Sequence, residues 1–590
     1  MLFEFFLVTG KLMGRSARRR VCFLGGIPEF TAEMSLEKQP MHLRQPVLAS
    51  RSMQPHRSPR LTLLPDLVRR SGCYSAVVLA GILWIAPLTS HAAEKLWLDV
   101  ARSSITTSEL HSHVSVLADD MLEGREAGSR GGRAAAKYLV GRLKEAALQP
   151  AGSNGRFTQP FLHGHQNLLA LLPGSDPELR DEYVVIGAHY DHVGYGTRRN
   201  SYGPWGYIHN GADDNASGVA AVLEVIDALS HAEHRPRRSI LFAFWDGEEK
   251  GLLGSKHWIG QPTIPAEAVK LAINIDMVGR LTDGRIEVGG TRCTHGARRL
   301  FSSSQLGEGL WLDFKWEYKN NSDHWTFYEA GIPSLYLHTG LHDDYHRPSD
   351  DVEKLNVDGI RQVSGYLLQQ LSQLADSEEL PTFRSAASRE NPAAQQRLEH
   401  PLPTLAPRLD FTWDYVPSVP AAVVVQQVPW RSQAKQAGLT AGDRIEKVNG
   451  QPISSEAFLP AVALQSAGEI ELQVSRTGID EPLTVIVPLI GSPTRLGLSW
   501  RADPAEPRAV YVTRVVPYSP ADLAGIHLHD RLYAINSEPI SGPDELLHRV
   551  QGLLDDGEEV LQLEVESRGA IREIVVSLGP PAAPVSDATL

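Results

Sequence analysis

Short clusters of histidine and carboxylate residues recur between residues 189 and 346, each after apolar residues or in a glycine-rich stretch. Histidine nitrogen and carboxylate oxygen are common zinc ligands. Carboxylates packed closely together repel one another unless a cation lies between them. The pattern therefore predicts a divalent metal site. The clusters are His189-Tyr190-Asp191-His192, Asp213-Asp214-Asn215, Asp246-Gly247-Glu248-Glu249, Asp276, and Asp343-Asp344-Tyr345-His346.

The number of ligands fits two metal ions that catalyse hydrolysis. Two histidines and three carboxylates, one of them shared, would give each ion three protein ligands and leave a position for water. Two adjacent ions can hold both oxygens of a hydrolytic transition state. The neighbouring Glu248 and Glu249 divide into a ligand and a general base. Taken alone, an Asp-Asp-Asn run before a helix is also a helix cap, so the conjunction of clusters carries the prediction.

The elements that must position these clusters are strands and helices in alternation. Asn215–Ser230 and Gly359–Leu374 have the apolar spacing of helices. The alternation predicts an α/β domain whose largely parallel central sheet is flanked by helices. Ligands bind at the carboxyl ends of the strands in such a sheet. The predicted strands are Glu182–Ala188, Ser239–Trp245, Leu271–Ile275 and Ile332–Leu337.

These motifs resemble those of the M28 peptidases, the zinc aminopeptidase clan of the bacterial leucyl aminopeptidase type. The matching segments lie between residues 187 and 356, in the family's order. The resemblance implies a zinc-exopeptidase fold and a metallopeptidase that hydrolyses peptide bonds at the N-terminus of peptides, with two Zn²⁺ ions per chain. The segments are GAHYDHVG, GADDNASGVAAVLEV, FWDGEEKGLLGS, NIDMVGR, SDHWTFYEAGIPSLYLHTG and DDYHRPSDDVEKLN.

The resemblance also implies the metal ligands. His189 and Asp276 would bind one zinc ion, and Glu249 and His346 would bind the other. Asp213 would bridge the two ions. Two other histidines lie close to His346 in the sequence, but His346 alone has the Tyr-His-x-Pro-x-Asp context of the family.

Three further residues receive roles from the resemblance. Glu248 would be the general base that takes a proton from the attacking water. Asp191 would orient His189, because metal-bound imidazoles usually need a partner on their other nitrogen. His324 would lie near the substrate.

Other functions remain open at this point. Glutaminyl cyclases share the fold but use one zinc ion, and carboxypeptidases and dipeptidases belong to the wider clan. A chain with an inactive peptidase domain could also act as a non-catalytic scaffold. The presence of all five expected ligands and the base favours a two-zinc enzyme.

Composition limits the choice further. The 590-residue chain has a formal net charge of −13, which argues against a general nucleic-acid binder. It has three cysteines, and only Cys293 lies outside the N-terminal region. A metal in the mature chain is therefore held by histidine and carboxylate groups, not by a thiolate cluster.

The N-terminal region, residues 1–92, reads as an extension that ends in a signal peptide. Arg69-Arg70 precede the apolar run Cys73–Leu88, and small residues follow up to Ala92. The run is shorter than the roughly 20 residues of a spanning helix, which favours cleavage over a membrane anchor. We expect a secreted or periplasmic protein with no membrane span after cleavage. Met53 is an alternative start.

An internal repeat follows the predicted peptidase domain (94–375) and a linker (376–408). Residues 433–454 realign with residues 520–541 at a constant offset of 87. The repeats resemble PDZ domains of bacterial proteases and predict two small β-rich modules, residues 409–490 and 493–580. The alternative is that they act as rigid spacers.

The second repeat contains a sequence typical of a PDZ carboxylate-binding loop, Leu496-Gly497-Leu498 after Arg495. Such loops bind the C-terminus of a peptide through backbone N–H groups. In the first repeat the same offset places Asp410 at the glycine position. We expect its carboxylate to repel a peptide carboxylate, so the second module is the predicted peptide binder.

Overall fold

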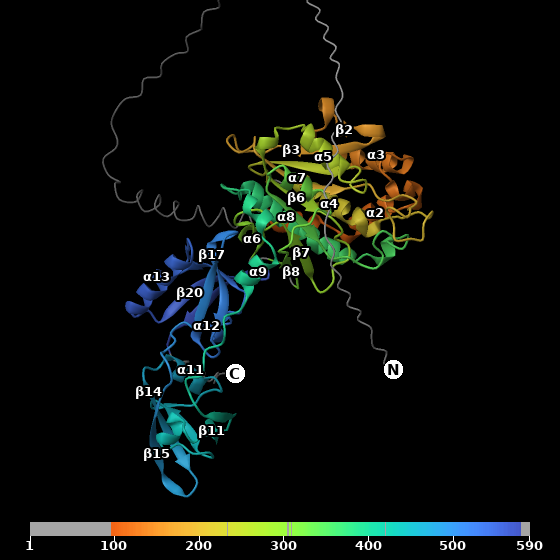
Figure 1. Cartoon of the computed structure of the whole chain (residues 1–590). Coiled ribbons are helices and arrows are strands. Elements are labelled where there is room, and N and C mark those ends of the chain that lie inside the picture. The colour runs from red at the N-terminus through yellow and green to blue at the C-terminus, as the bar shows by residue number, and fades with distance from the viewer. Residues whose placement is uncertain (1–95, 233, 304–305, 308, 419, 580–590) are drawn as a thin grey trace, which may run out of the picture. The chain divides into compact units, whose positions relative to one another are not determined.

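The computed structural model describes residues 96–579, except residues 233, 304–305, 308 and 419 (Figure 1). The predicted signal peptide and the rest of the N-terminal extension lie outside the described residues. Within the described ranges, none of the helices combines the length and apolar character that a membrane crossing requires.

A mixed sheet, nine-stranded within the described residues, forms the centre of the peptidase region. The strand order is β1-β3-β5-β4-β6-β9-β7-β8, and β2 pairs with β3. The neighbours β5, β4, β6 and β9 run parallel, whereas β3 and β7 pair antiparallel with β5 and β9. The strands are β1 (Gln149–Pro150), β2 (Thr158–Pro160), β3 (Gln166–Leu172), β4 (Tyr183–His189), β5 (Ser239–Trp245), β6 (Val269–Ile275), β7 (Arg285–Gly289), β8 (Trp311–Phe314) and β9 (Ser334–His338).

Helices lie around this sheet (Figure 1). Several begin at a capping side chain, as Thr106 caps α2 by accepting the N–H of Glu109 and Asn356 caps α8 by accepting the N–H of Gly359. The helices are α2 (Thr107–Leu117), α3 (Arg130–Glu145), α4 (Gly218–His231), α5 (Leu253–Gly260), α6 (Ala297–Phe301), α7 (His324–Glu329) and α8 (Val357–Asp376).

The central strands are apolar on both faces because each face packs against helices. Val184 and Ile186 of β4 join a core with residues of α2, α3, α4 and α8. The intervening Val185 faces the other way and joins a second core with Trp258 of α5 and Phe327 of α7. This alternation follows from the two-residue period of a strand.

The predicted α/β fold class is confirmed. The predicted strand at 239–245 coincides with β5, and the closing helix is two residues longer at each end than predicted. Residues 376–408 differ from the expected irregular linker, since they contain α9 (Pro392–Glu399). Asn391 caps this helix and Pro392 starts it, a sequence signal for a helix that is too short to show a clear apolar period.

The first PDZ-like module is a six-stranded antiparallel sheet of order β10-β11-β12-β14-β15, with β13 beside β12. Phe411, Phe458 and Ile470 lie in its own hydrophobic core. Its elements are β10 (Thr412–Val416), β11 (Ala422–Gln427), α10 (Gln433–Gln436), β12 (Arg444–Val448), β13 (Gln451–Pro452), α11 (Phe458–Gln465), β14 (Glu469–Arg476) and β15 (Ile479–Pro488).

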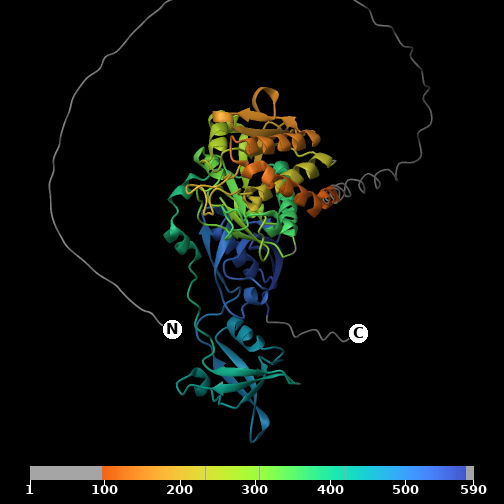
Figure 2. The ribbon, with the colours of Figure 1, turned by 90° about the vertical axis from the view of Figure 1, so that its right-hand side faces the viewer.

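The second module repeats this arrangement with the order β16-β17-β18-β20-β21 and β19 beside β18. It is the blue part of the ribbon in Figure 2. The 87-residue sequence repeat therefore corresponds to a repeated structure. Its elements are β16 (Leu498–Asp503), β17 (Glu506–Val515), α12 (Pro520–Leu523), β18 (Arg531–Ile535), β19 (Glu538–Pro539), α13 (Pro543–Asp555), β20 (Val560–Ser567) and β21 (Ala570–Ser577).

Buried ion pairs join the second module to the peptidase region. Arg292 contacts Asp503, which also pairs with Arg531 at 3.2 Å. Arg298 of α6 pairs with the fully buried Glu566 at 2.7 Å. Because these charged groups are removed from water, the stability of each charge depends on its ion-pair partner.

Candidate active site

The predicted site residues meet at one edge of the sheet because they follow strands that run in the same direction. β4 ends at His189, and the Asp246–Glu249 and Asp276 segments directly follow β5 and β6. His346 lies in the loop after β9. The turn 212–217 leads into α4, which packs on β4 and adds the two aspartates.

The first cluster consists of His189, Asp214 and Asp276, all buried. The Nε2 atom of His189 lies 3.3 Å from an oxygen of Asp276 and 3.3 Å from Oδ1 of Asp214. The other ring nitrogen, Nδ1, lies 3.2 Å from the main-chain oxygen of Asp191. Because Nδ1 of His189 contacts this main-chain oxygen, Nε2 is the ring nitrogen that faces Asp214 and Asp276.

The second cluster consists of His192, Asp214, Glu249 and His346. The Nε2 atom of His346 lies 3.0 Å from Oδ2 of Asp214 and 3.1 Å from Oε1 of Glu249. The Nδ1 atom of His192 lies 2.9 Å from the same Glu249 oxygen. The ring nitrogens of His192 and His346 therefore lie close to the same Glu249 oxygen.

Asp214 belongs to both clusters, one carboxylate oxygen facing each. The carboxylate of Asp213, the residue expected to bridge the two ions, lies outside both groups. Asp213 instead accepts the N–H of Gly279 at 2.6 Å and the hydroxyl of Ser217 at 2.9 Å. Two identical side chains stand next to each other in a tight turn, and the sequence pattern does not reveal which one points inward.

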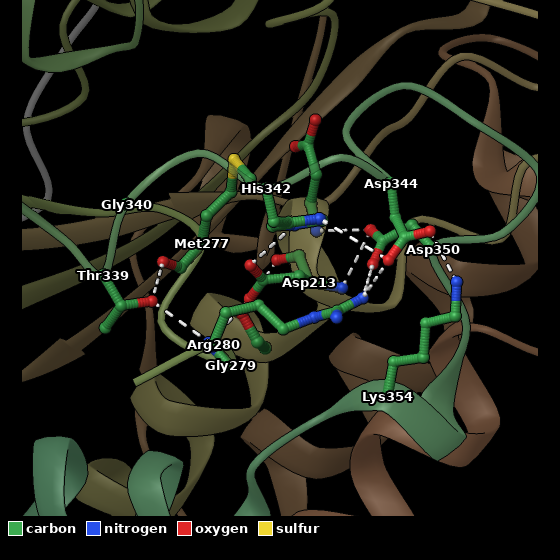
Figure 3. A network of polar contacts seen from close by, with 12 residues as sticks. Asp213, Met277, Gly279, Arg280, Thr339, Gly340, His342, Asp344, Asp350 and Lys354 are labelled. Atoms are coloured by element: carbon green, nitrogen blue, oxygen red, sulfur yellow. Dashed lines mark hydrogen bonds and ion pairs between the residues drawn. The ribbon is translucent and has the colours of Figure 1, made fainter. Parts of the chain in front are cut away.

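A second layer of polar contacts holds this turn in place (Figure 3). The fully buried Asp350 accepts the backbone N–H groups of Asp213 and Asp214, each at 3.0 Å. Arg280 lies 3.2 Å from the other oxygen of Asp350, and His342 Nε2 lies 3.1 Å from Asp213. These contacts fix the direction in which the Asp214 side chain projects.

The adjacent glutamates have opposite electrostatic environments. Burial raises the pKa of Glu248 well above its ordinary value, although nearby His189 acts in the opposite direction. Burial also acts to raise the pKa of Glu249, but hydrogen bonds from His192 and His346 leave it below its ordinary value. Glu249 therefore stays ionised, whereas Glu248 accepts a proton readily.

Asp191 lies beneath these groups and is completely buried. One of its carboxylate oxygens accepts the N–H of Glu248 at 3.1 Å and lies 3.9 Å from Nδ1 of His189. Burial raises the pKa of Asp191 well above its ordinary value, and the nearby Asp246 adds to this effect. The side chain therefore contacts the main chain of Glu248 more closely than the ring it was expected to orient.

The donor set suits zinc. Every side chain in the two clusters offers a histidine nitrogen or a carboxylate oxygen, and no thiol is present in either. Three carboxylates, Asp214, Glu249 and Asp276, approach one another in a buried space. Divalent cations would offset their mutual repulsion.

Comparison with known proteins agrees with this geometry. The model of peptidase family M28 matches residues 167–370, which hold all six residues of the two clusters. These residues form an M28 peptidase domain. The PDZ domain model matches residues 484–566, within the C-terminal part of the chain.

Relatives of the M28 domain carry peptidase names. Leupeptin-inactivating enzyme 1 of Streptomyces exfoliatus is 30% identical over 246 residues, which cover 41% of this chain and 50% of that protein. Leucine aminopeptidase 1 of Grosmannia clavigera is 27% identical over 270 residues, 43% of this chain and 63% of that protein. The chain thus spans between half and two thirds of these two relatives. The LapA aminopeptidase structure of Legionella pneumophila is 19% identical, with a TM-score of 0.39, over 48% of this chain and 74% of that chain.

Two buried residues of the M28 domain have shifted pKa values. His324, expected near the substrate, is buried, and its ring packs between Tyr318 and Tyr336. Burial lowers the pKa of His324 to about 4. Cys293 is also buried, and burial raises the pKa of its thiol to about 11, so it is a poor nucleophile.

Sequence reasoning missed two residues at the M28 site. His192 was read only as part of its motif, although it lies in the second cluster. Tyr345 precedes His346, and the two rings stack with centroids 3.9 Å apart. Burial raises the pKa of Tyr345, so its hydroxyl stays protonated and able to donate a hydrogen bond. The only sequence signal for both was direct adjacency to a predicted ligand motif.

The predicted PDZ loop, Leu496-Gly497-Leu498, leads into β16, which is an edge strand of its sheet. Gly497 has a positive φ of 87°, and a Cβ atom there would lie 2.1 Å from the side chain of Ser519. The equivalent Asp410 of the first module turns toward α10, where its carboxylate accepts the N–H groups of Gln433 and Ala434. Asp410 therefore has hydrogen-bond partners within its own module, and its expected repulsion of a peptide carboxylate stays a prediction.

Proposed function

We propose that the chain is a two-zinc metallopeptidase that removes N-terminal residues from peptides. The observation that carries the proposal is the Asp214 carboxylate, with one oxygen in each of two clusters of zinc-type donors. A shared carboxylate is the arrangement that two adjacent ions need, whereas a one-zinc cyclase would need only one cluster.

The ligands follow from the clusters. His189 and Asp276 would hold one ion, Glu249 and His346 the other, and Asp214 both. When bound there, zinc would polarise the peptide carbonyl and make an attacking water more acidic. His192 lies beside Glu249 and would hold that carboxylate in place.

Glu248 is the candidate general base. It is not part of either cluster, it follows β5 directly beside Glu249, and its raised pKa favours acceptance of a proton from water. The hydrogen bond from the Glu248 N–H to the Asp191 carboxylate fixes the main chain of Glu248. Tyr345, whose ring stacks on His346 and whose pKa burial raises, would donate a hydrogen bond to the oxygen of the substrate carbonyl.

The aminopeptidase assignment is supported by relatives named as aminopeptidases. Peptides with free and with acetylated N-termini separate the alternatives. We expect hydrolysis of the free peptides only, loss of activity on dialysis against a chelator, and recovery with zinc. Cleavage of acetylated peptides from their C-terminal end would favour a carboxypeptidase, and release of pyroglutamate a cyclase.

We further propose that the second PDZ-like module binds peptide C-termini at Leu496-Gly497-Leu498. β16 is the first strand in the sheet order of the described residues, and a peptide would add beside it as a further strand. In the first module the loop arginine, Arg408, is engaged with the carbonyl groups of Ala463, Ser466 and Ile490. The N–H of Ile490 also donates to the Arg408 oxygen, which favours a spacer role there.

The proposed setting is the periplasm or the cell exterior, reached through the signal sequence. N-terminal sequencing of the protein purified from its native cells tests this. A mature chain that starts at Ala93 is expected, and a chain that retains residues 73–88 would argue for an uncleaved anchor.

A further inference from the structure

One loop of the M28 domain exposes an unusual number of aromatic side chains. It runs from residue 194 to residue 210, and we call it the aromatic loop. Tyr195, Tyr202, Trp205 and Tyr207 on this loop are all exposed to solvent. Isolated exposed aromatic residues need no explanation, but a concentration of them on one surface segment usually marks a binding site.

The aromatic loop is fixed to a ligand of the proposed metal site. The main-chain oxygen of His346 accepts the N–H of Tyr202 at 3.1 Å and the hydroxyl of Ser201 at 3.0 Å. Arg347 donates to the main-chain oxygens of Tyr202 and Gly203 at 3.1 Å. The Tyr202 ring lies 6.5 Å from the His346 ring, between centroids. The loop position is therefore coupled to the site.

His346 also marks the side on which the site opens to solvent. Its side chain is 15% exposed, compared with 2% for His189, 0% for His192 and 6% for Glu249. The aromatic loop contacts this most exposed ligand.

Guanidinium groups hold two of the rings. Arg198 lies over the Trp205 ring at 4.8 Å, and Arg347 lies over the Tyr202 ring at 5.8 Å. Such cation–π contacts restrict the motion of the rings before a ligand binds. A ligand that packs on them then loses less conformational entropy on binding.

We propose that the aromatic loop binds the part of a peptide that follows the scissile bond and selects a large apolar or aromatic side chain at the second residue. This inference rests on the proposed aminopeptidase function. In such an enzyme the N-terminal residue occupies the closed part of the site, so the remainder of the peptide must leave through the open side. Tyr202 lies beside His346, the most exposed ligand, and Trp205 donates to the main-chain oxygen of Ser201 in the same loop.

The test compares kcat/KM for two dipeptide amides with the same first residue, Leu-Phe-amide and Leu-Gly-amide. We expect the wild-type protein to prefer Leu-Phe-amide. Trp205→Ala and Tyr202→Ala should each reduce the Phe/Gly ratio about fivefold, the effect of one exposed aromatic contact. The matched control is Trp430→Ala, because Trp430 is an exposed tryptophan under Arg431 in the first PDZ-like module. It should leave the ratio unchanged.

The outcomes separate this inference from the proposed function. If the wild-type protein hydrolyses neither amide, the aminopeptidase proposal fails and the inference falls with it. If it hydrolyses both, but the Phe/Gly ratio is the same in wild type, Trp205→Ala and Tyr202→Ala, the inference alone is overturned. An equal reduction of kcat/KM for both amides would also overturn it, because it would indicate a structural role for the loop.

Discussion

Replacement of Asp214 by asparagine separates the two adjacent aspartates most sharply. The change keeps the size of the side chain and removes its charge. Because Asp214 faces both clusters, the proposal predicts that both lose zinc. Asp213→Asn is the matched control, since it makes the same chemical change one residue away.

The expected magnitudes follow from the contacts. Two unit charges about 4 Å apart interact by about 4 kcal/mol at an effective dielectric constant of about 20, and this corresponds to roughly a thousandfold in affinity. Asp214→Asn should therefore weaken zinc binding at each cluster by about that factor. Asp213 contacts Gly279, Ser217 and His342 but lies in neither cluster. Its replacement should cost about 10- to 100-fold, as for residues that support metal ligands.

The assay is zinc content by mass spectrometry after equilibration in zinc-buffered solutions, with circular dichroism as the check on folding. We expect no retained zinc in Asp214→Asn at free zinc concentrations that saturate the wild type, and partial loss in Asp213→Asn. If Asp214→Asn stayed fully loaded while Asp213→Asn lost both ions, the reasoning would be refuted and Asp213 would be the bridging residue.

Three other changes test separate parts of the account. Glu248→Gln should lower kcat by roughly two to four orders of magnitude and leave the zinc content unchanged. Glu249→Gln should instead lose zinc. If kinetics and metal analysis gave the reverse result, the roles of the two glutamates would be exchanged. Gly497→Asp should abolish binding of C-terminal peptides to the full-length protein in calorimetry, because the new side chain would meet Ser519, and undiminished binding would exclude this loop. Burial raises the pKa of Glu224 to about 8 from an ordinary 4.5, so the folded protein retains a proton that the unfolded chain releases, and stability falls as pH rises through this window. Glu224→Gln should therefore raise Tm at pH 8 by a few degrees and change it little near pH 4.5, and an equal shift at both pH values would contradict this origin.

The fold was predictable because the strands carry strong local signals. Segments such as 239–245 consist of apolar residues throughout, since both faces of β5 are buried. The helix α9 was not predicted, because it buries only Leu398 and so leaves almost no apolar period. The β-rich modules were recognisable by their repeat, which preserves the Asp-Arg and Asn-containing turns of each copy.

The site was predictable where chemistry follows a strand end, as at His189 and Asp276. It was not predictable where two neighbours share a chemical type. The choice between Asp213 and Asp214 depends on the contacts of Asp350 and Arg280, residues more than 60 positions away in the sequence. The direction of the Asp410 side chain likewise depends on α10, which no local pattern indicates.

The most direct test of the central claim is anomalous diffraction at the zinc absorption edge from crystals of the wild-type protein grown with zinc. The account predicts two peaks, one beside His189 and Asp276 and one beside Glu249 and His346, with the Asp214 carboxylate between them. A single peak, or two peaks that share Asp213 instead, would contradict it.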